Sequence, residues 1–113
     1  MVLERQGEKT SIKAANRLSL SDTRSRAVLV AFQSVVVTTL NDAAPERIAI
    51  KAKPENGRMR AGAAALKMEG IVLANAHCDV QFISGARVNR VETIENGLYA
   101  YLQDALKTAL AAL

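Results

Sequence analysis

Basic side chains near the middle of the chain are the residues whose type and spacing best suggest a chemistry. Six of them fall in a 21-residue stretch that holds only one acid, Glu55: Arg47, Lys51, Lys53, Arg58, Arg60 and Lys67. Four flank a loop at Pro54–Gly57, which we expect to lead into a helix: Lys51, Lys53, Arg58 and Arg60. A helix N-terminus attracts anions, and arginine adds forked donors. The pattern predicts a phosphate-binding loop, with a solvated basic loop as the alternative.

Three adjacent residues, His77, Cys78 and Asp79, resemble a nucleophile beside its base. We expect a strand here, and successive side chains of a strand point to opposite faces, so His77 and Cys78 should not meet. One histidine and one cysteine also do not complete a zinc site. The chain has no glycine-rich phosphate loop with its lysine and hydroxyl. The sequence therefore predicts a protein that is not an enzyme and needs no cofactor or metal, with Cys78 as a buried apolar residue.

Composition and charge narrow the class of protein. The chain has 113 residues, half of them apolar, with four aromatic residues and no tryptophan. We therefore expect one globular domain with an aliphatic core, and no aromatic platform for stacking bases. The net charge of +4 and the pI near 9.6 favour a polyanionic partner without requiring one.

The sequence also gives an expectation for the cellular compartment of the protein. The single cysteine cannot form an intramolecular disulfide, and the charged segment Met1–Thr10 does not resemble a secretory leader. The longest apolar run, Ala27–Leu40, is too short to span a membrane. We expect a cytoplasmic protein with no membrane partner, or a nucleoid or nuclear one if the polymer is DNA.

The elements that must position the basic residues follow from periodicity. Residues 1–15 show no consistent face and predict a flexible segment, whereas residues 16–113 predict a single α/β domain. Strands are expected at Asn16–Leu20, Arg47–Ala52, Cys78–Ile83 and Arg87–Ile94, and helices at Ala27–Leu40, Arg58–Asn75 and from Asn96 onwards. The order is β-α-β-α-β-β with an added C-terminal helix. Right-handed crossovers would place the helices on one face, giving a two-layer sandwich.

A leucine row marks the expected last helix at every third or fourth position: Leu98, Leu102, Leu106, Leu110 and Leu113. Alanines widen this row until little polar surface remains. The row either forms part of the core or packs against a partner. We favour self-association, because so apolar a helix is hard to bury in a small domain. The expected oligomer interface is Leu98, Leu102, Leu106 and Leu110.

Three short motifs resemble the Alba family of small basic nucleic-acid-binding proteins: RIAIKA at Arg47–Ala52, NGR at Asn56–Arg58 and RVETIE at Arg90–Glu95. The resemblance implies an Alba-like dimer that contacts nucleic-acid backbone through the loop before its first helix and the turn before its second. Those positions are Arg24 and Arg26, then Arg58 and Arg60. The C-terminal domain of bacterial translation initiation factor 3 has a similar element order.

The leading hypothesis is a small basic protein that binds DNA or RNA mainly through backbone phosphates, as a homodimer or higher homo-oligomer. The expected contact residues are Arg24, Arg26, Lys51, Lys53, Arg58 and Arg60. The alternative is a structural or assembly subunit whose C-terminal leucine-rich helix drives oligomerisation, without nucleic-acid binding.

Overall fold

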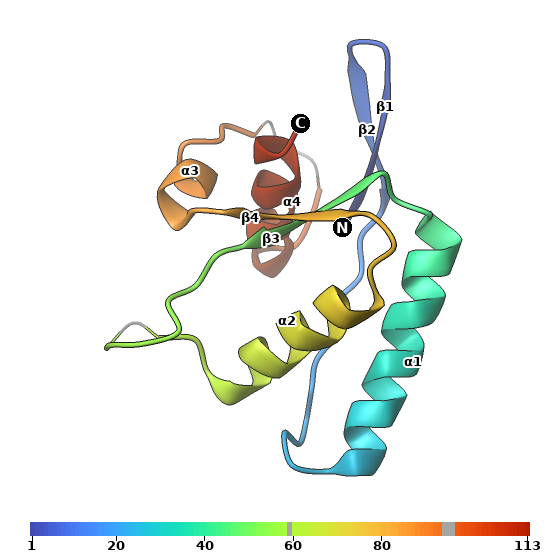
Figure 1. Cartoon of the computed structure of the whole chain (residues 1–113). Helices are drawn as coiled ribbons and strands as arrows, with labels where there is room; N and C mark the ends of the chain where they lie inside the picture. The colour runs from blue at the N-terminus through green and yellow to red at the C-terminus, as the bar shows by residue number, and fades with distance from the viewer. Residues whose placement is uncertain (59, 94–96) are drawn as a thin grey trace. The chain divides into compact units, whose positions relative to one another are not determined.

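The computed structural model describes residues 1–58, 60–93 and 97–113, in which helices are interspersed with short strands (Figure 1). The α/β class expected from the sequence is confirmed. The described residues form two small sheets and four helices, in the order β1 (Val2–Gln6), β2 (Lys9–Ala14), α1 (Arg26–Ala43), β3 (Arg47–Lys51), α2 (Ala63–Asn75), β4 (Asp79–Ile83), α3 (Gly85–Asn89) and α4 (Ala100–Ala111). None of these helices is long and apolar enough to cross a membrane.

Strands β1 and β2 form an antiparallel hairpin in residues 1–15, where the sequence predicted no regular structure. Gly7 turns the chain between them with a φ of +63°, a conformation that glycine adopts without a side-chain penalty. Ladder hydrogen bonds join backbone groups whatever the side chains are, so a strand pair can form without an apolar face to reveal it. The strand expected at Asn16–Leu20 is wrong, because these residues instead lead into α1.

Helix α1 confirms the helix expected over Ala27–Leu40, despite its many valines. The hydroxyl of Ser25 caps it by accepting the N–H of Val28 at 3.3 Å. Helical periodicity predicts one packed stripe, formed by Ala27, Val30, Ala31, Ser34, Val37, Thr38 and Leu40. This prediction is wrong, because Phe32 and Val36 are the buried residues of α1 and every residue of the stripe except half-buried Leu40 is exposed. Because α1 is apolar on more than one side, periodicity alone did not identify the buried side.

Helix α2 begins at Ala63, five residues after the predicted start at Arg58. The loop before it bends at Gly57, which has a φ of +86°, and the N–H of Arg60 donates to the carbonyl oxygen of Gly57 at 3.3 Å. Arg58 and Arg60 therefore lie on the loop and not in the first turn of the helix. Met59, which the sequence placed in the helical stripe, lies outside the described residues.

Strands β3 and β4 pair in a two-stranded sheet, which confirms the strands expected near Arg47–Ala52 and Cys78–Ile83. The chain runs in the same direction along both strands (Figure 1), as a strand-helix-strand connection requires. Just beyond β3, the N–H of Ala52 donates to the carbonyl oxygen of Ile83 at 2.8 Å. The predicted strand-helix-strand unit is therefore present, with α2 as its helix.

The return strand expected at Arg87–Ile94 is wrong, because Gly85–Asn89 forms the short helix α3. The hydroxyl of Ser84 accepts the N–H of Arg87 at 3.2 Å and caps this helix. Serine followed by glycine suits a tight turn, but serine is equally a preferred N-cap, and the sequence does not distinguish the two. Residues 94–96, which were expected to end the strand and open the last helix, lie outside the described residues.

The chain divides into two compact units, each with its own buried cluster. The hairpin unit comprises Met1–Arg17, Ala49–Ala52 and Gln81–Leu113, and its cluster centres on Ile83 and Val88, which are fully buried. The α1–α2 unit comprises Leu18–Ile48 and Lys53–Val80. Its cluster contains Leu20, Phe32 and Val36, packed against Ala64, Met68, Ile71 and Val72 of α2. The expected single domain from residue 16 to residue 113 stays a prediction.

Helix α4 carries the three central leucines of the row, Leu102, Leu106 and Leu110, and two of them are covered within the chain. Leu102 is 9% exposed and Leu106 is 5% exposed, whereas Leu98 and Leu110 are half-buried. The core alternative is therefore the one that the burial favours for Leu102 and Leu106. The guanidinium of Arg87 donates to the carbonyl oxygen of Ala111 at 2.7 Å and so satisfies an acceptor in the last turn of α4.

Candidate functional site

A groove in the α1–α2 unit gathers three positively charged side chains, as many as the loop before α2 carries. The groove has a volume of about 660 Å³ and its walls come from α1, α2 and the residues just before α1. Its lining consists of Thr23, Arg24, Arg26, Leu29, Val30, Gln33, Lys67, Gly70, Ile71 and Ala74. The volume lies within the range of about 300–1,000 Å³ that is typical of ligand clefts. We call this feature the α1–α2 groove.

The groove is built from the same helical spacing on both sides. The lining residues of α1 are Arg26, Leu29, Val30 and Gln33, and those of α2 are Lys67, Gly70, Ile71 and Ala74. Each set follows i, i+3, i+4, i+7, the positions that share one face of a helix. Leu29 and Ile71 also pack against the buried cluster, so the floor of the groove is anchored in the core.

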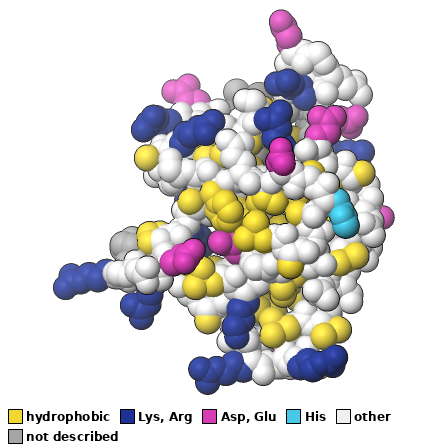
Figure 2. Space-filling model, viewed as in Figure 1, with side chains coloured by type: hydrophobic (Ala, Val, Ile, Leu, Met, Phe, Trp, Pro, Cys, Tyr) yellow, Lys and Arg dark blue, Asp and Glu magenta, His cyan; other side chains and the backbone are white. Residues whose placement is uncertain are grey.

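Three cations line the groove: Arg24, Arg26 and Lys67. Within the part of the chain that the structure describes, no carboxylate forms an ion pair with them. The nearest acid in sequence, Asp22, accepts the backbone N–H of Arg24 at 2.9 Å through its carboxylate. Figure 2 shows Lys and Arg side chains over the N-terminal end of α1, at the bottom of the view. The expected pair Arg24 and Arg26 is thus joined by Lys67, which the sequence did not place with them.

Polar contacts brace the groove at two points along its length. The ammonium of Lys67 donates to the carbonyl oxygen of Thr23. Further along the helices, the amide of Asn75 donates to the side-chain oxygen of Gln33 at 3.3 Å. A lysine ammonium has three donors, so two remain for a ligand. The bracing keeps α1 and α2 in register beside the apolar floor.

The basic loop before α2 provides further positive charge in the same unit. Lys53, Arg58 and Arg60 are exposed, and the guanidinium of Arg60 donates to the carbonyl oxygen of Gly57 at 3.4 Å. In Figure 2 the loop carries Lys and Arg side chains at the lower left of the view. These three cations remain available to an anion, but the helix start that was expected to assist them lies beyond Arg60.

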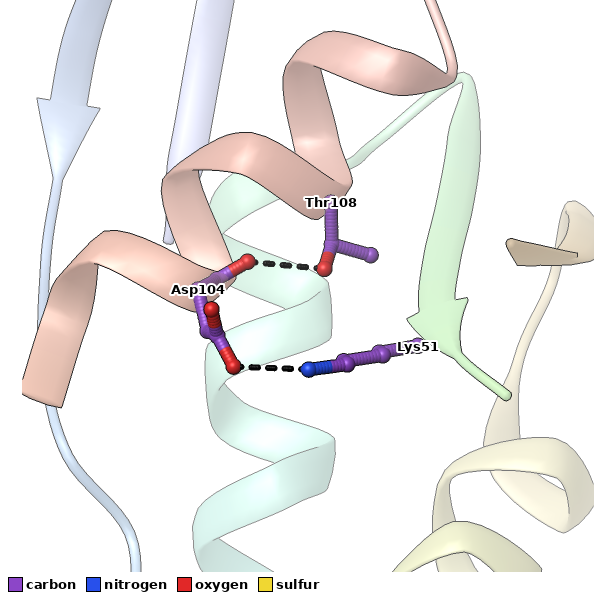
Figure 3. Close-up of polar contacts among 3 residues, drawn as sticks. All are labelled: Lys51, Asp104 and Thr108. Atoms are coloured by element: carbon purple, nitrogen blue, oxygen red, sulfur yellow. Dashed lines mark hydrogen bonds and ion pairs between the residues drawn. The ribbon is translucent and has the colours of Figure 1, made fainter. Parts of the chain in front are cut away.

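Lys51 belongs to the hairpin unit and pairs with an acid. Its ammonium lies 2.8 Å from a carboxylate oxygen of Asp104 on α4, whose carbonyl oxygen accepts the hydroxyl of Thr108 at 2.7 Å (Figure 3). The expected role of Lys51 in binding stays a prediction. Sequence reasoning missed this pair because strand and helix lie 53 residues apart.

A double-mutant cycle measures what the Lys51–Asp104 pair contributes. We expect Lys51→Met and Asp104→Asn to show a coupling of about 0.2–1 kcal/mol in urea unfolding, because both side chains are partly exposed and solvent screens the pair. Salt should reduce the coupling. A coupling of zero at low salt would show that the contact adds no stability.

His77 and Cys78 both line one small cavity, and the expectation that their side chains do not meet stays a prediction. The cavity has a volume of about 260 Å³ and also includes Leu40, Asn41, Ala44 and Pro45. Strand β4 begins only at Asp79, so the alternation of a strand does not apply to the two residues before it. Cys78 is half-buried, not buried. The described residues hold no group of three or more potential metal ligands.

An exposed aromatic pair in the hairpin unit was also missed. The rings of Tyr99 and Tyr101 stack with centroids 5.7 Å apart, and the guanidinium of Arg17 lies 5.1 Å from the centroid of the Tyr101 ring. The tyrosines are 72% and 55% exposed. Composition predicted no aromatic platform, and the i, i+2 spacing gave no helical signal because Tyr99 lies outside α4 as its N-cap.

Comparison with known proteins places the chain in a family. Residues 1–112 match the family model described as protein of unknown function DUF3010. No curated protein and no solved structure matches the chain.

The resemblance to the Alba family is wrong, since the family match is to DUF3010 and no Alba match was found. Two of its three motifs also lose their structural meaning. NGR at Asn56–Arg58 lies on a loop and does not open a helix, and the chain before RVETIE forms α3 where a strand was expected. Short motifs of common residues carry little information about fold, so they matched without a shared structure.

Proposed function

Because the chain belongs to the DUF3010 family, whose members are described as proteins of unknown function, we propose a function from its surface chemistry: binding of nucleic acid, mainly through backbone phosphates, by the α1–α2 unit. The contact residues are Arg24, Arg26 and Lys67 at the groove, with Lys53, Arg58 and Arg60 on the loop before α2. The proposal involves no catalytic step.

The observation that carries this proposal is the convergence of Arg24, Arg26 and Lys67 on one groove without a paired carboxylate among the described residues. Bringing three like charges together is unfavourable unless solvent or an anion compensates them. Arginine forks fit phosphate oxygens, and the N-terminal end of α1, whose first turn contains no acidic residue, adds a positive dipole. A polymer of phosphates provides several anions at once.

Among the described residues no acid lines the α1–α2 groove, although the α1–α2 unit contains six. Asp42, Glu46 and Asp79 lie in the last turn of α1, before β3 and at the start of β4. The 18 residues of α1 span about 27 Å, so Asp42 lies more than two Debye lengths from the groove cations at physiological salt. The other three acids, Asp22, Glu55 and Glu69, lie closer in sequence to the cations, so the unit as a whole is nearly neutral.

A salt titration tests the proposal directly. We expect the affinity for duplex DNA, single strands and structured RNA, measured by fluorescence anisotropy, to fall linearly with salt on logarithmic axes. Each neutralised phosphate contributes a slope of about −0.9 for duplex and −0.7 for single strands, so three to six contacts give about −2 to −5. Affinity that is flat between 50 and 200 mM salt, or no binding at low salt, would contradict phosphate binding.

The assembly alternative has less support, because Leu102 and Leu106 are buried within the chain and do not form an exposed adhesive row. A helix face that is already covered gains little by association. The expected homodimer stays a prediction, and light scattering with and without nucleic acid measures it. A large assembly that ignores added DNA and RNA would favour the alternative.

A further inference from the structure

The α1–α2 groove is lined by more than positive charge, because its side chains change from basic to aliphatic to polar along its length. Arg24, Arg26 and Lys67 stand at the end near the start of α1. Leu29, Val30 and Ile71 form the floor. The amide of Gln33, held by Asn75, lies beyond them. A phosphate site alone would not need the aliphatic side chains that line the groove beside the cations.

We propose that the groove holds one unstacked nucleotide of a single strand, with its phosphate on the cations, its base against the aliphatic floor and the edge of the base at the Gln33 amide. This inference rests on the proposed function and names the form of polymer that the site prefers. The groups of a nucleotide match the side chains along the groove in the same order: an anionic phosphate, then a flat base with apolar faces, then the polar edge of the base. Charge complementarity at one end fixes which way the nucleotide lies.

The preference for single strands follows from access to the base. In a duplex the faces of the bases are stacked on one another, so a duplex offers the groove only its phosphates. A single strand offers phosphates and also a free base face. Both polymers should therefore bind through the cations, and only the single strand should gain affinity from contact between a base and the floor of the groove.

Gly70 provides a way to fill the floor without touching the charges. It lies within α2, lines the groove and is exposed, and a Cβ added there meets no atom within 4 Å. Leucine at this position would project into the space where the base is proposed to lie. Glycine is a poor helix residue, so both leucine and alanine should stabilise α2 by up to about 1 kcal/mol. A loss of binding would then not be a loss of folding.

We expect Gly70→Leu to weaken binding to a single-stranded oligonucleotide about fivefold to tenfold, since burial of about 40 Å² of apolar surface between a base and the aliphatic floor is worth about 1 kcal/mol. Its affinity for the duplex of the same sequence, and the salt slopes for both polymers, should not change. Gly70→Ala should bind as wild type, because a methyl group fills little of the groove. Adenosine monophosphate should displace the single strand more effectively than ribose 5-phosphate, which lacks the base.

Other outcomes would overturn the inference in distinct ways. Unchanged single-strand affinity of Gly70→Leu, or equal competition by the two phosphates, would remove the base from the groove while leaving phosphate binding intact. If Tyr99→Ala lowers the affinity for the single strand and Gly70→Leu does not, the base contacts the tyrosine pair and not the groove. If wild type binds neither polymer at low salt, the proposed function itself fails, and the inference with it.

Discussion

Phe32→Ala is expected to lower the free energy of unfolding by about 3–5 kcal/mol, a large share of the roughly 5–15 kcal/mol available to a small protein. Phe32 is 8% exposed and lies in the cluster with Leu20 and Val36, against which α2 packs. Truncation removes the contacts that hold α1 to α2 and leaves a cavity between the helices. Because Leu29 and Ile71 connect this cluster to the α1–α2 groove, the groove should lose its shape as well.

The chain contains a matched control for this change. Phe82 is the other phenylalanine and is 43% exposed, so Phe82→Ala should cost much less, about 1 kcal/mol or below. Phe32→Leu retains most of the apolar volume and keeps the measurement possible if Phe32→Ala does not fold. Urea unfolding followed by helical circular dichroism gives all three values. Equal costs for Phe32→Ala and Phe82→Ala would show that α1 and α2 do not pack as described.

Removing the three groove charges together should reduce nucleic-acid affinity about a hundredfold at low salt. The variant Arg24→Gln, Arg26→Gln, Lys67→Gln retains hydrogen-bond donors, but each lost charge-assisted contact costs about 1 kcal/mol. The salt slope should become less steep by about two to three, one contact for each cation removed. The loss should be similar for unrelated sequences, since phosphates carry no sequence information.

A second triple variant separates local contact from overall charge. Lys9→Gln, Lys13→Gln, Arg90→Gln removes the same number of positive charges from exposed residues of the hairpin unit. The two variants therefore have equal net charge, so non-specific attraction to a polyanion is equally reduced. We expect the hairpin-unit variant to keep most of the affinity and the slope. Equal losses in both variants would show that binding depends on net charge and not on the groove.

Part of the fold could be predicted from the sequence because local signals were unambiguous there. The apolar run of α1 was too long for a strand, and β3 alternated clearly between Ile48, Ile50 and basic neighbours. The hairpin β1–β2 and helix α3 were missed for the opposite reason. Backbone pairing in β1–β2 does not require an apolar face, and Ser84 and Gly85 satisfy both a turn and a helix cap.

Part of the candidate site could likewise be predicted from the sequence and part could not. The sequence located Arg58 and Arg60 as cations of an exposed loop, because charge density and loop residues are local properties, whereas Arg24 and Arg26 were expected only from the resemblance to the Alba family. It also counted Lys51 among them, whereas the structure pairs Lys51 with Asp104. It did not bring Lys67 to Arg24 and Arg26. That juxtaposition depends on two helices far apart along the chain.

The sequence by itself determined the α/β class, the main helices and an excess of positive charge around residues 47–67. Only the tertiary structure decided which side of α1 faces the core, since α1 is apolar on more than one side and burial depends on where Leu20 and α2 lie. That choice leaves Val30 exposed on the floor of a groove beside three cations. The physical reason is that helical periodicity fixes which residues share a face, whereas packing against distant residues fixes which face meets solvent.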